Sequence, residues 1–167
     1  MGTINYFTSD LITLATVPQL WSDYHDEAEA EARETGRDID EIIAEWKEAN
    51  DEADADNAES ILDKYNLQFF HVTLRPGYYD GLQILIDMDG YPDELDDGER
   101  HAILDKLDDL QKALEDLAGV GFVETFPGWC TGYSDYPETI KAIRQAIDAE
   151  RETVKAIPAW TPEGWTA

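Results

Sequence analysis

The residues with the clearest chemical potential are eight acids that recur every three or four positions in the first half of the chain. They are Asp38, Glu41, Glu45, Glu48, Glu52, Asp56, Glu59 and Asp63. Residues with this spacing share one face of a continuous helix. At about 1.5 Å of rise per residue, the row would be about 38 Å long. Carboxylates in such a row can recognise Lys and Arg side chains, as phosphates do. The alternative interpretation is the ordinary solvated face of an acidic protein.

The length of this row invites comparison with DNA. One strand of B-DNA carries a phosphate about every 3.4 Å, so about 38 Å corresponds to about eleven base pairs. Like charges three or four residues apart destabilise a helix by a few tenths of a kcal/mol per pair. The row is therefore costly for an isolated helix, and a partner that neutralises it would relieve the cost.

The acidic excess of the chain is clustered. The 167 residues include 38 Asp and Glu against 12 Lys and Arg, a formal net charge of −26. Residues 23–63 hold 17 acids and 3 bases, and residues 87–116 hold 12 acids and 3 bases, which gives −14 and −9. Such charge keeps a protein soluble but works against compaction. It repels nucleic acids and anionic membranes, and it attracts a basic protein or a cation.

A second acidic patch is predicted in the loop after residue 90. Its members are Asp93, Glu94, Asp96, Asp97 and Glu99. The start of this loop resembles a calcium loop, because aligning Gly90 with position 6 of an EF-hand puts Asp87 and Asp89 at positions 3 and 5. Positions 1 and 12 are then Leu85 and Asp96, so the motif fails at both ends. A calcium-binding interaction protein is one alternative for the function.

The remaining reactive residues do not form a recognisable catalytic or metal-binding pattern. The single cysteine, Cys130, could act as a nucleophile only if His25, His71 or His101 approached it. One cysteine and three scattered histidines match no zinc-ligand spacing. We therefore predict that the protein is not an enzyme and uses no cofactor or metal.

The first half of the chain is predicted to begin with strands and to continue with helices. Residues 4–7 and 11–15 are strand candidates, and residues 23–35 form a helix that we expect to be exposed because it contains few apolar residues. Gly36 would end it. Asp38 and Glu41 fit a capping box at the start of the next helix. This helix is expected over 38–65. The Asp/Ala/Asn stretch at 49–58 has little to bury, so the sequence leaves open whether the helix is continuous there.

The second half of the chain is predicted to supply the sheet and two more helices. Apolar alternation on both sides of Pro76-Gly77 predicts a β-hairpin over about 67–87. An amphipathic helix over 100–117, a strand over 122–126 and a last helix over 137–158 follow. The fold class is α+β: a small antiparallel sheet packed on one face by amphipathic helices, with an acidic helical N-terminal half. We expect a single domain over 1–158, with a tail at 159–167.

The overall composition excludes several classes of protein. The hydrophobic fraction of 43% is too high for a disordered acidic tail. No stretch approaches 18 apolar residues, and the N-terminus lacks the basic and apolar regions of a signal peptide. The single cysteine suits a reducing compartment, so we expect a cytoplasmic protein. A homodimer is compatible with these features.

Two aromatic-glycine segments are distinctive: residues 76–81 (PGYYDG) and 127–133 (PGWCTGY). Together with the hairpin and the last helix, they resemble small uncharacterised proteins carried by phages and other mobile elements, over residues 67–158. In size, charge and α+β build, the chain is similar to phage DNA-mimic inhibitors of restriction or CRISPR systems. This resemblance implies a bacterial host cell and a basic host protein as partner.

These features together predict a non-enzymatic DNA mimic. It would occupy the basic nucleic-acid channel of a host defence complex, either a CRISPR effector or a restriction enzyme. The row at 38–63 and the patch at 93–99 would make the contacts. A salt-adapted acidic globular protein without mimicry is the other alternative, and it predicts evenly distributed acids.

Overall fold

The computed structural model describes residues 10–17, 21–76, 81–125 and 133–159. Its elements confirm the predicted α+β class. In chain order they are β1 (Asp10–Thr16), α1 (Trp21–Thr35), α2 (Ile39–Leu62), β2 (His71–Pro76), β3 (Leu82–Asp87), α3 (Asp97–Gly119), β4 (Phe122–Glu124) and α4 (Tyr136–Ala156). The strand candidate at 4–7 lies outside the described residues, whereas the candidate at 11–15 is confirmed within β1.

The strands form one antiparallel sheet in the order β2-β3-β1-β4. The predicted hairpin is β2 and β3, which pair from His71 opposite Asp87 to Pro76 opposite Leu82. β1 lies between β3 and β4, so the N-terminal strand becomes central. This strand order depends on pairing between β1 and strands that are far away in sequence. Hydrophobic alternation within one strand does not indicate which other strand it will pair with.

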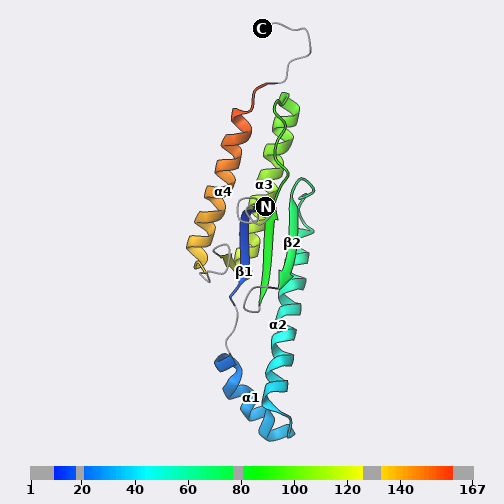
Figure 1. Cartoon of the computed structure of the whole chain (residues 1–167), viewed down its shortest axis with the longest axis vertical. Helices are drawn as coiled ribbons and strands as arrows, with labels where there is room; N and C mark the ends of the chain where they lie inside the picture. The colour runs from blue at the N-terminus through cyan, green and yellow to red at the C-terminus, as the bar shows by residue number, and fades with distance from the viewer. Residues whose placement is uncertain (1–9, 18–20, 77–80, 126–132, 160–167) are drawn as a thin grey trace, which may run out of the picture.

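The main core lies between the sheet and the helices. Leu82, Ile84 and Ile86 of β3 are buried and alternate with half-buried neighbours, which is the pattern of a strand covered on one face. They belong to one apolar cluster with Leu14 of β1 and with the leucine and isoleucine faces of α3 and α4. α3 and α4 run side by side along the sheet (Figure 1). We call this part of the molecule, together with residues 58–62 of α2, the body.

α1 and the first half of α2 project beyond the sheet at one end of the molecule (Figure 1). Ala28 of α1 is buried against Ile42 and Ile43 of α2, and Tyr24 and Trp46 pack around them. The sequence predicts an exposed α1, and this is wrong at Ala28, because a small side chain lets the two helices approach closely. We call α1 and residues 39–46 of α2 the arm.

α2 is one continuous helix, and it runs unbroken through residues 49–58, where the sequence left its continuity open. The segment contains several alanines, the strongest helix formers, and the helix is anchored by apolar contacts on both sides of it. Gly36, with φ of 74°, ends α1 as predicted, and its N–H donates to the carbonyl of Ala32. None of the described helices combines the length and apolar character needed to cross a bilayer.

Candidate acidic interaction surface

The eight acids predicted as a row lie along α2 and at its two ends. We call them the acidic stripe; all eight are exposed, and they are Asp38, Glu41, Glu45, Glu48, Glu52, Asp56, Glu59 and Asp63. At about 100° per residue they fall within an arc of about 80°. Asp38 and Asp63 are the cap residues, and the other six lie within the helix. The structure therefore brings the whole predicted row onto one helix face.

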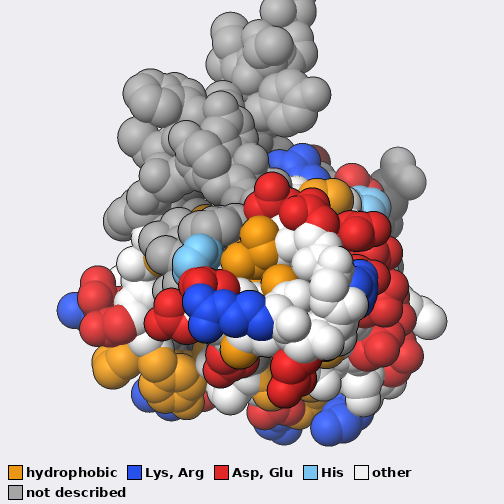
Figure 2. All heavy atoms as spheres, turned by 90° about the horizontal axis from the view of Figure 1, so that it is seen from below, with side chains coloured by type: hydrophobic (Ala, Val, Ile, Leu, Met, Phe, Trp, Pro, Cys, Tyr) orange, Lys and Arg blue, Asp and Glu red, His pale blue; other side chains and the backbone are white. Residues whose placement is uncertain are grey.

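The opposite side of α2 explains why the stripe faces solvent. Ile42 and Ile43 are buried in the arm, and Ala58 and Ile61 are buried in the body. These contacts fix the rotation of the helix at both ends and leave the acids outside. Seen from the end formed by α1 and α2, Asp and Glu side chains crowd the right-hand edge of the molecule (Figure 2).

One cation is bound to the stripe. Arg37, in the turn between α1 and α2, donates to Oε1 of Glu45 at 2.6 Å. The hydrogen bond to Glu45 and its charge raise the pKa of the Arg37 guanidinium, with smaller contributions from Glu41 and Glu31. Within the part of the chain that the structure describes, no other stripe acid has an ion pair within 4.0 Å. The surface is thus one of largely uncompensated negative charge.

Sequence reasoning missed one acid that is set apart from the stripe. Asp54 is half-buried on the inner side of α2, and burial followed by the charge of Asp51 raises the pKa of its carboxyl group. The sequence does contain a signal for this difference, because Asp51 and Asp54 do not fit the spacing of three or four residues that relates the stripe acids. These two acids belong to the packing side of the helix rather than to the exposed row.

The predicted second patch lies around the first turn of α3. We call Asp93, Glu94, Asp96, Asp97 and Glu99 the loop patch; all are exposed. Asp96 accepts from the N–H of Glu99 at 2.7 Å, and Glu99 accepts from the N–H of Asp96 at 3.2 Å. This is a complete capping box, and it satisfies amide groups that the start of a helix leaves unpaired. Asp97 and Glu99 also face the positive end of the helix dipole.

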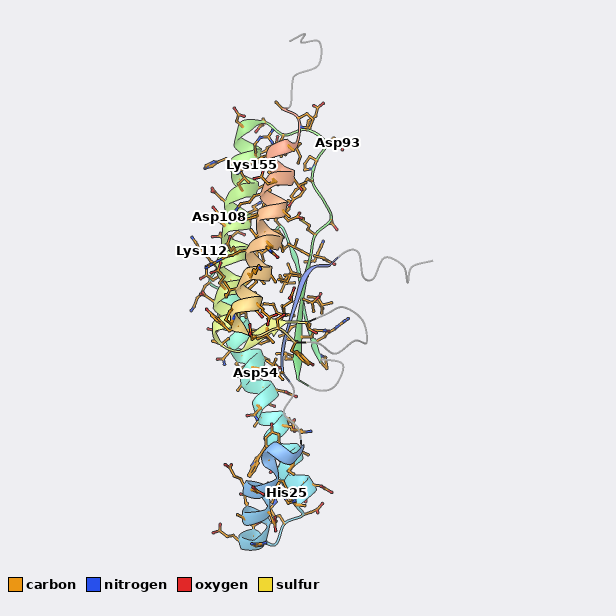
Figure 3. All side chains as sticks on the ribbon, turned by 90° about the vertical axis from the view of Figure 1, so that its left-hand side faces the viewer. His25, Asp54, Asp93, Asp108, Lys112 and Lys155 are labelled. Carbon is orange, nitrogen blue, oxygen red and sulfur yellow. The ribbon has the colours of Figure 1, made fainter. Side chains whose placement is uncertain are left out.

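Three of the five loop-patch acids therefore have a local structural role. The capping box predicted at Asp38 and Glu41 is wrong, since the Asp38 side chain makes no capping hydrogen bond. Asp93 and Glu94 are the members that helix capping does not explain. Asp93 lies near one end of the elongated molecule and the arm at the other, so the structure does not bring the stripe and the loop patch together (Figure 3).

The loop considered for calcium is partly engaged in protein contacts. Asp89 lies 3.0 Å from Nε2 of His71, and Gly90 has a φ of 113°. Tyr91 donates to Glu150 of α4 at 2.8 Å and stacks on Phe69, which ties the loop to the body. Burial, and then the hydrogen bond to Glu150, raise the pKa of the Tyr91 hydroxyl. These contacts with the body explain the conformation of the loop without a bound ion.

One group of side chains in the described residues has metal-ligand geometry. The ligand atoms of His25, Asp26 and Glu29 on α1 lie within 4.8 Å of one another. Glu29 is also paired with Arg33 at 2.5 Å, and Asp26 is fully exposed. This group is an open surface cluster in which a cation already competes for one ligand. Cys130 and the segment around it lie outside the described residues.

Comparisons with known proteins do not assign the chain to a family. Searches against protein-family models, curated proteins and solved structures gave no significant match.

Proposed function

We propose that this protein is a non-enzymatic inhibitor that imitates DNA and occupies the basic nucleic-acid channel of a host defence complex, a CRISPR effector or a restriction enzyme. The observation that carries the proposal is the acidic stripe, a row of eight exposed carboxylates of which six lie on one face of the continuous helix α2 and two are its cap residues. The proposed mechanism is occlusion, and it requires no covalent step.

The dimensions of the stripe suit one strand of a duplex. The 24 residues of α2 span about 36 Å, the length of about ten base pairs. Successive carboxylates are about 5 Å apart along the axis, compared with about 3.4 Å for the phosphates of one strand. A helix is about 10–12 Å wide with its side chains, so it presents one row of charge and not two. The proposed contact is with the Lys and Arg residues that hold one backbone of the duplex.

The energetics of the stripe favour a cationic partner. Its neighbouring acids repel one another within the free protein, and cations from a partner would replace this repulsion by attraction. Each exposed ion pair contributes about 0–1 kcal/mol, so affinity must come from several contacts acting together. Clustered charge also accelerates association with an oppositely charged channel. Binding should therefore weaken steeply as salt rises, because exposed charges are screened.

Charge reversal on the stripe tests this proposal. The variant Glu48→Lys, Glu52→Lys, Asp56→Lys changes the net charge by 3 × 2, or +6, and spares Glu45, which binds Arg37. Inhibition of DNA binding by a purified CRISPR effector or restriction enzyme should fall by about 100-fold or more, if each lost contact contributes about 1 kcal/mol. Circular dichroism would verify that the helical content persists.

The matched control carries the same charge change on the body. Asp105→Lys, Glu138→Lys, Glu152→Lys replaces three exposed acids of α3 and α4, and also changes the net charge by 3 × 2, or +6. We expect this variant to inhibit nearly as well as the natural protein at the same ionic strength. Equal loss in both variants would mean that bulk charge alone matters, and the localised mimic surface would be wrong.

A further inference from the structure

α2 is shared by two apolar clusters that do not touch each other along the helix. At its start, Ile42 and Ile43 pack with Ala28 in the arm, and Trp46 is the last side chain of that cluster. At its end, Ala58 and Ile61 belong to the core of the body, and Ala55 packs against them. The helix is therefore fixed at both ends by different groups of side chains.

The part of α2 between these clusters has no fully buried side chain. We call residues 47–57 the joint; none of its side chains is buried. It contains five acids and one base, for a net charge of −4, and five residues with weak helix propensity: Asn50, Asp51, Asp54, Asp56 and Asn57. Asn50 donates to the hydroxyl of Tyr24 at 2.8 Å, a contact with the arm. The joint therefore contributes little buried apolar surface to either cluster.

The arm on the far side of the joint is small. Among the side chains that the structure describes, its cluster has three buried residues, Ala28, Ile42 and Ile43, from α1 and α2. Helices of this length are marginal in water unless tertiary packing supports them. Proteins open in parts, and the parts with few buried apolar contacts open first. The body, with its sheet and two long helices, has far more buried apolar surface.

We infer that the arm and joint form a separate opening unit, less stable than the body, and that ionic strength controls its order through repulsion between the acids of the joint. At low salt the repulsion favours opening of α2 at the joint, and added salt or any polycation closes it. Ionic strength then controls how far the acidic helix α2 extends without interruption. This device operates in the isolated protein, so it does not depend on the proposed function.

Hydrogen exchange measured by mass spectrometry on the intact protein tests the inference. The amides of residues 24–57 should exchange faster than those in the centres of α3 and α4. Raising sodium chloride from about 0.01 M to about 1 M shortens the screening length from about 30 Å to about 3 Å. Exchange in residues 24–57 should then slow by about tenfold, with the body unchanged. A single protection level across arm and body, or protection in the arm that does not respond to salt, would overturn the inference.

A variant that lowers the net charge of the joint from −4 to −1 separates the effect of these charges from other effects of salt. Glu48→Gln, Glu52→Gln, Asp56→Asn removes five like-charge pairs at spacings of three or four: 45–48, 48–51, 48–52, 52–56 and 56–59. At low salt it should slow exchange in residues 24–57 by about tenfold and should remove most of the salt response. The control Asp105→Asn, Glu138→Gln, Glu152→Gln changes the net charge equally and should behave like the natural protein. Equal slowing in both variants would contradict a role for the joint.

Discussion

At the scale of single residues, position decides what an acid does in this protein. The stripe acids are exposed, and among the described ion pairs only Glu45 of the stripe takes part in one. Asp96 and Glu99 stabilise the start of α3 through backbone contacts. Asp54 is half-buried beside Asp51, in a setting that disfavours its charged form. Acids of the same type therefore have three different roles. The stripe acids form the proposed surface, Asp96 and Glu99 cap a helix, and Asp54 destabilises the fold locally.

The variant Asp54→Asn should stabilise the protein at neutral pH. Because burial and Asp51 raise the pKa of Asp54, the native state binds its proton more readily than the unfolded state does. Stability then falls as pH rises from about 4, the unfolded value, through the raised native value, and the full penalty remains at pH 7. The amide removes this penalty. The side chain is only partly buried, so the gain in thermal midpoint should be small, about 1 °C.

Thermal melts at several pH values, followed by circular dichroism, check this prediction. The gain should disappear below about pH 4, where Asp54 is protonated in both the folded and the unfolded state. A lower midpoint for Asp54→Asn at pH 7, or an equal gain at pH 3, would show that the carboxylate is not destabilising.

At the scale of elements, sequence periodicity predicted most of the fold. The alternation of Leu82, Ile84 and Ile86 predicted β3, and apolar spacing predicted α3 and α4. The arm packing around Ala28 was not predictable, because an alanine carries little hydrophobic signal. The sheet order was not predictable either, since β1 pairs with strands far away in sequence.

The two capping patterns show the limit of local sequence. Asp-x-x-Glu occurs at both 38–41 and 96–99, but only the second forms a capping box. The backbone differs at the two N-cap residues, with ψ of 132° at Asp38 and 172° at Asp96. The chain before each cap also differs: a short turn from α1 leads into Asp38, and a longer loop, tied to α4 by Tyr91, leads into Asp96.

Alanine substitution at the two caps should have unequal effects. Asp96→Ala removes a capping hydrogen bond and should lower the free energy of unfolding by about 1 kcal/mol. Asp38→Ala removes no such bond, so its effect should stay within about 0.5 kcal/mol. Urea denaturation of both variants measures the difference. Equal destabilisation would mean that Asp38 caps α2 in solution.

At the scale of the whole molecule, charge and shape are linked. The acidic arm extends from one end of the body, and the loop patch lies toward the other (Figure 3). The sequence correctly placed the stripe on one face of a helix, because helical spacing is a local property. It could not give the distance between stripe and loop patch, which depends on how α2 and α3 are arranged. The stripe alone therefore carries the proposed function, and the loop patch is a secondary candidate.

The most direct test of the proposed mimicry is a competition experiment. A purified CRISPR effector and a restriction enzyme, each loaded with labelled duplex DNA, are titrated separately with this protein at low ionic strength, and bound DNA is followed by fluorescence anisotropy and size-exclusion chromatography. The account predicts complete displacement of DNA from one of them, with the protein and DNA never in the same complex, and weaker displacement as salt rises. A stable ternary complex with DNA still seated in the channel, or no binding to either complex, would contradict it.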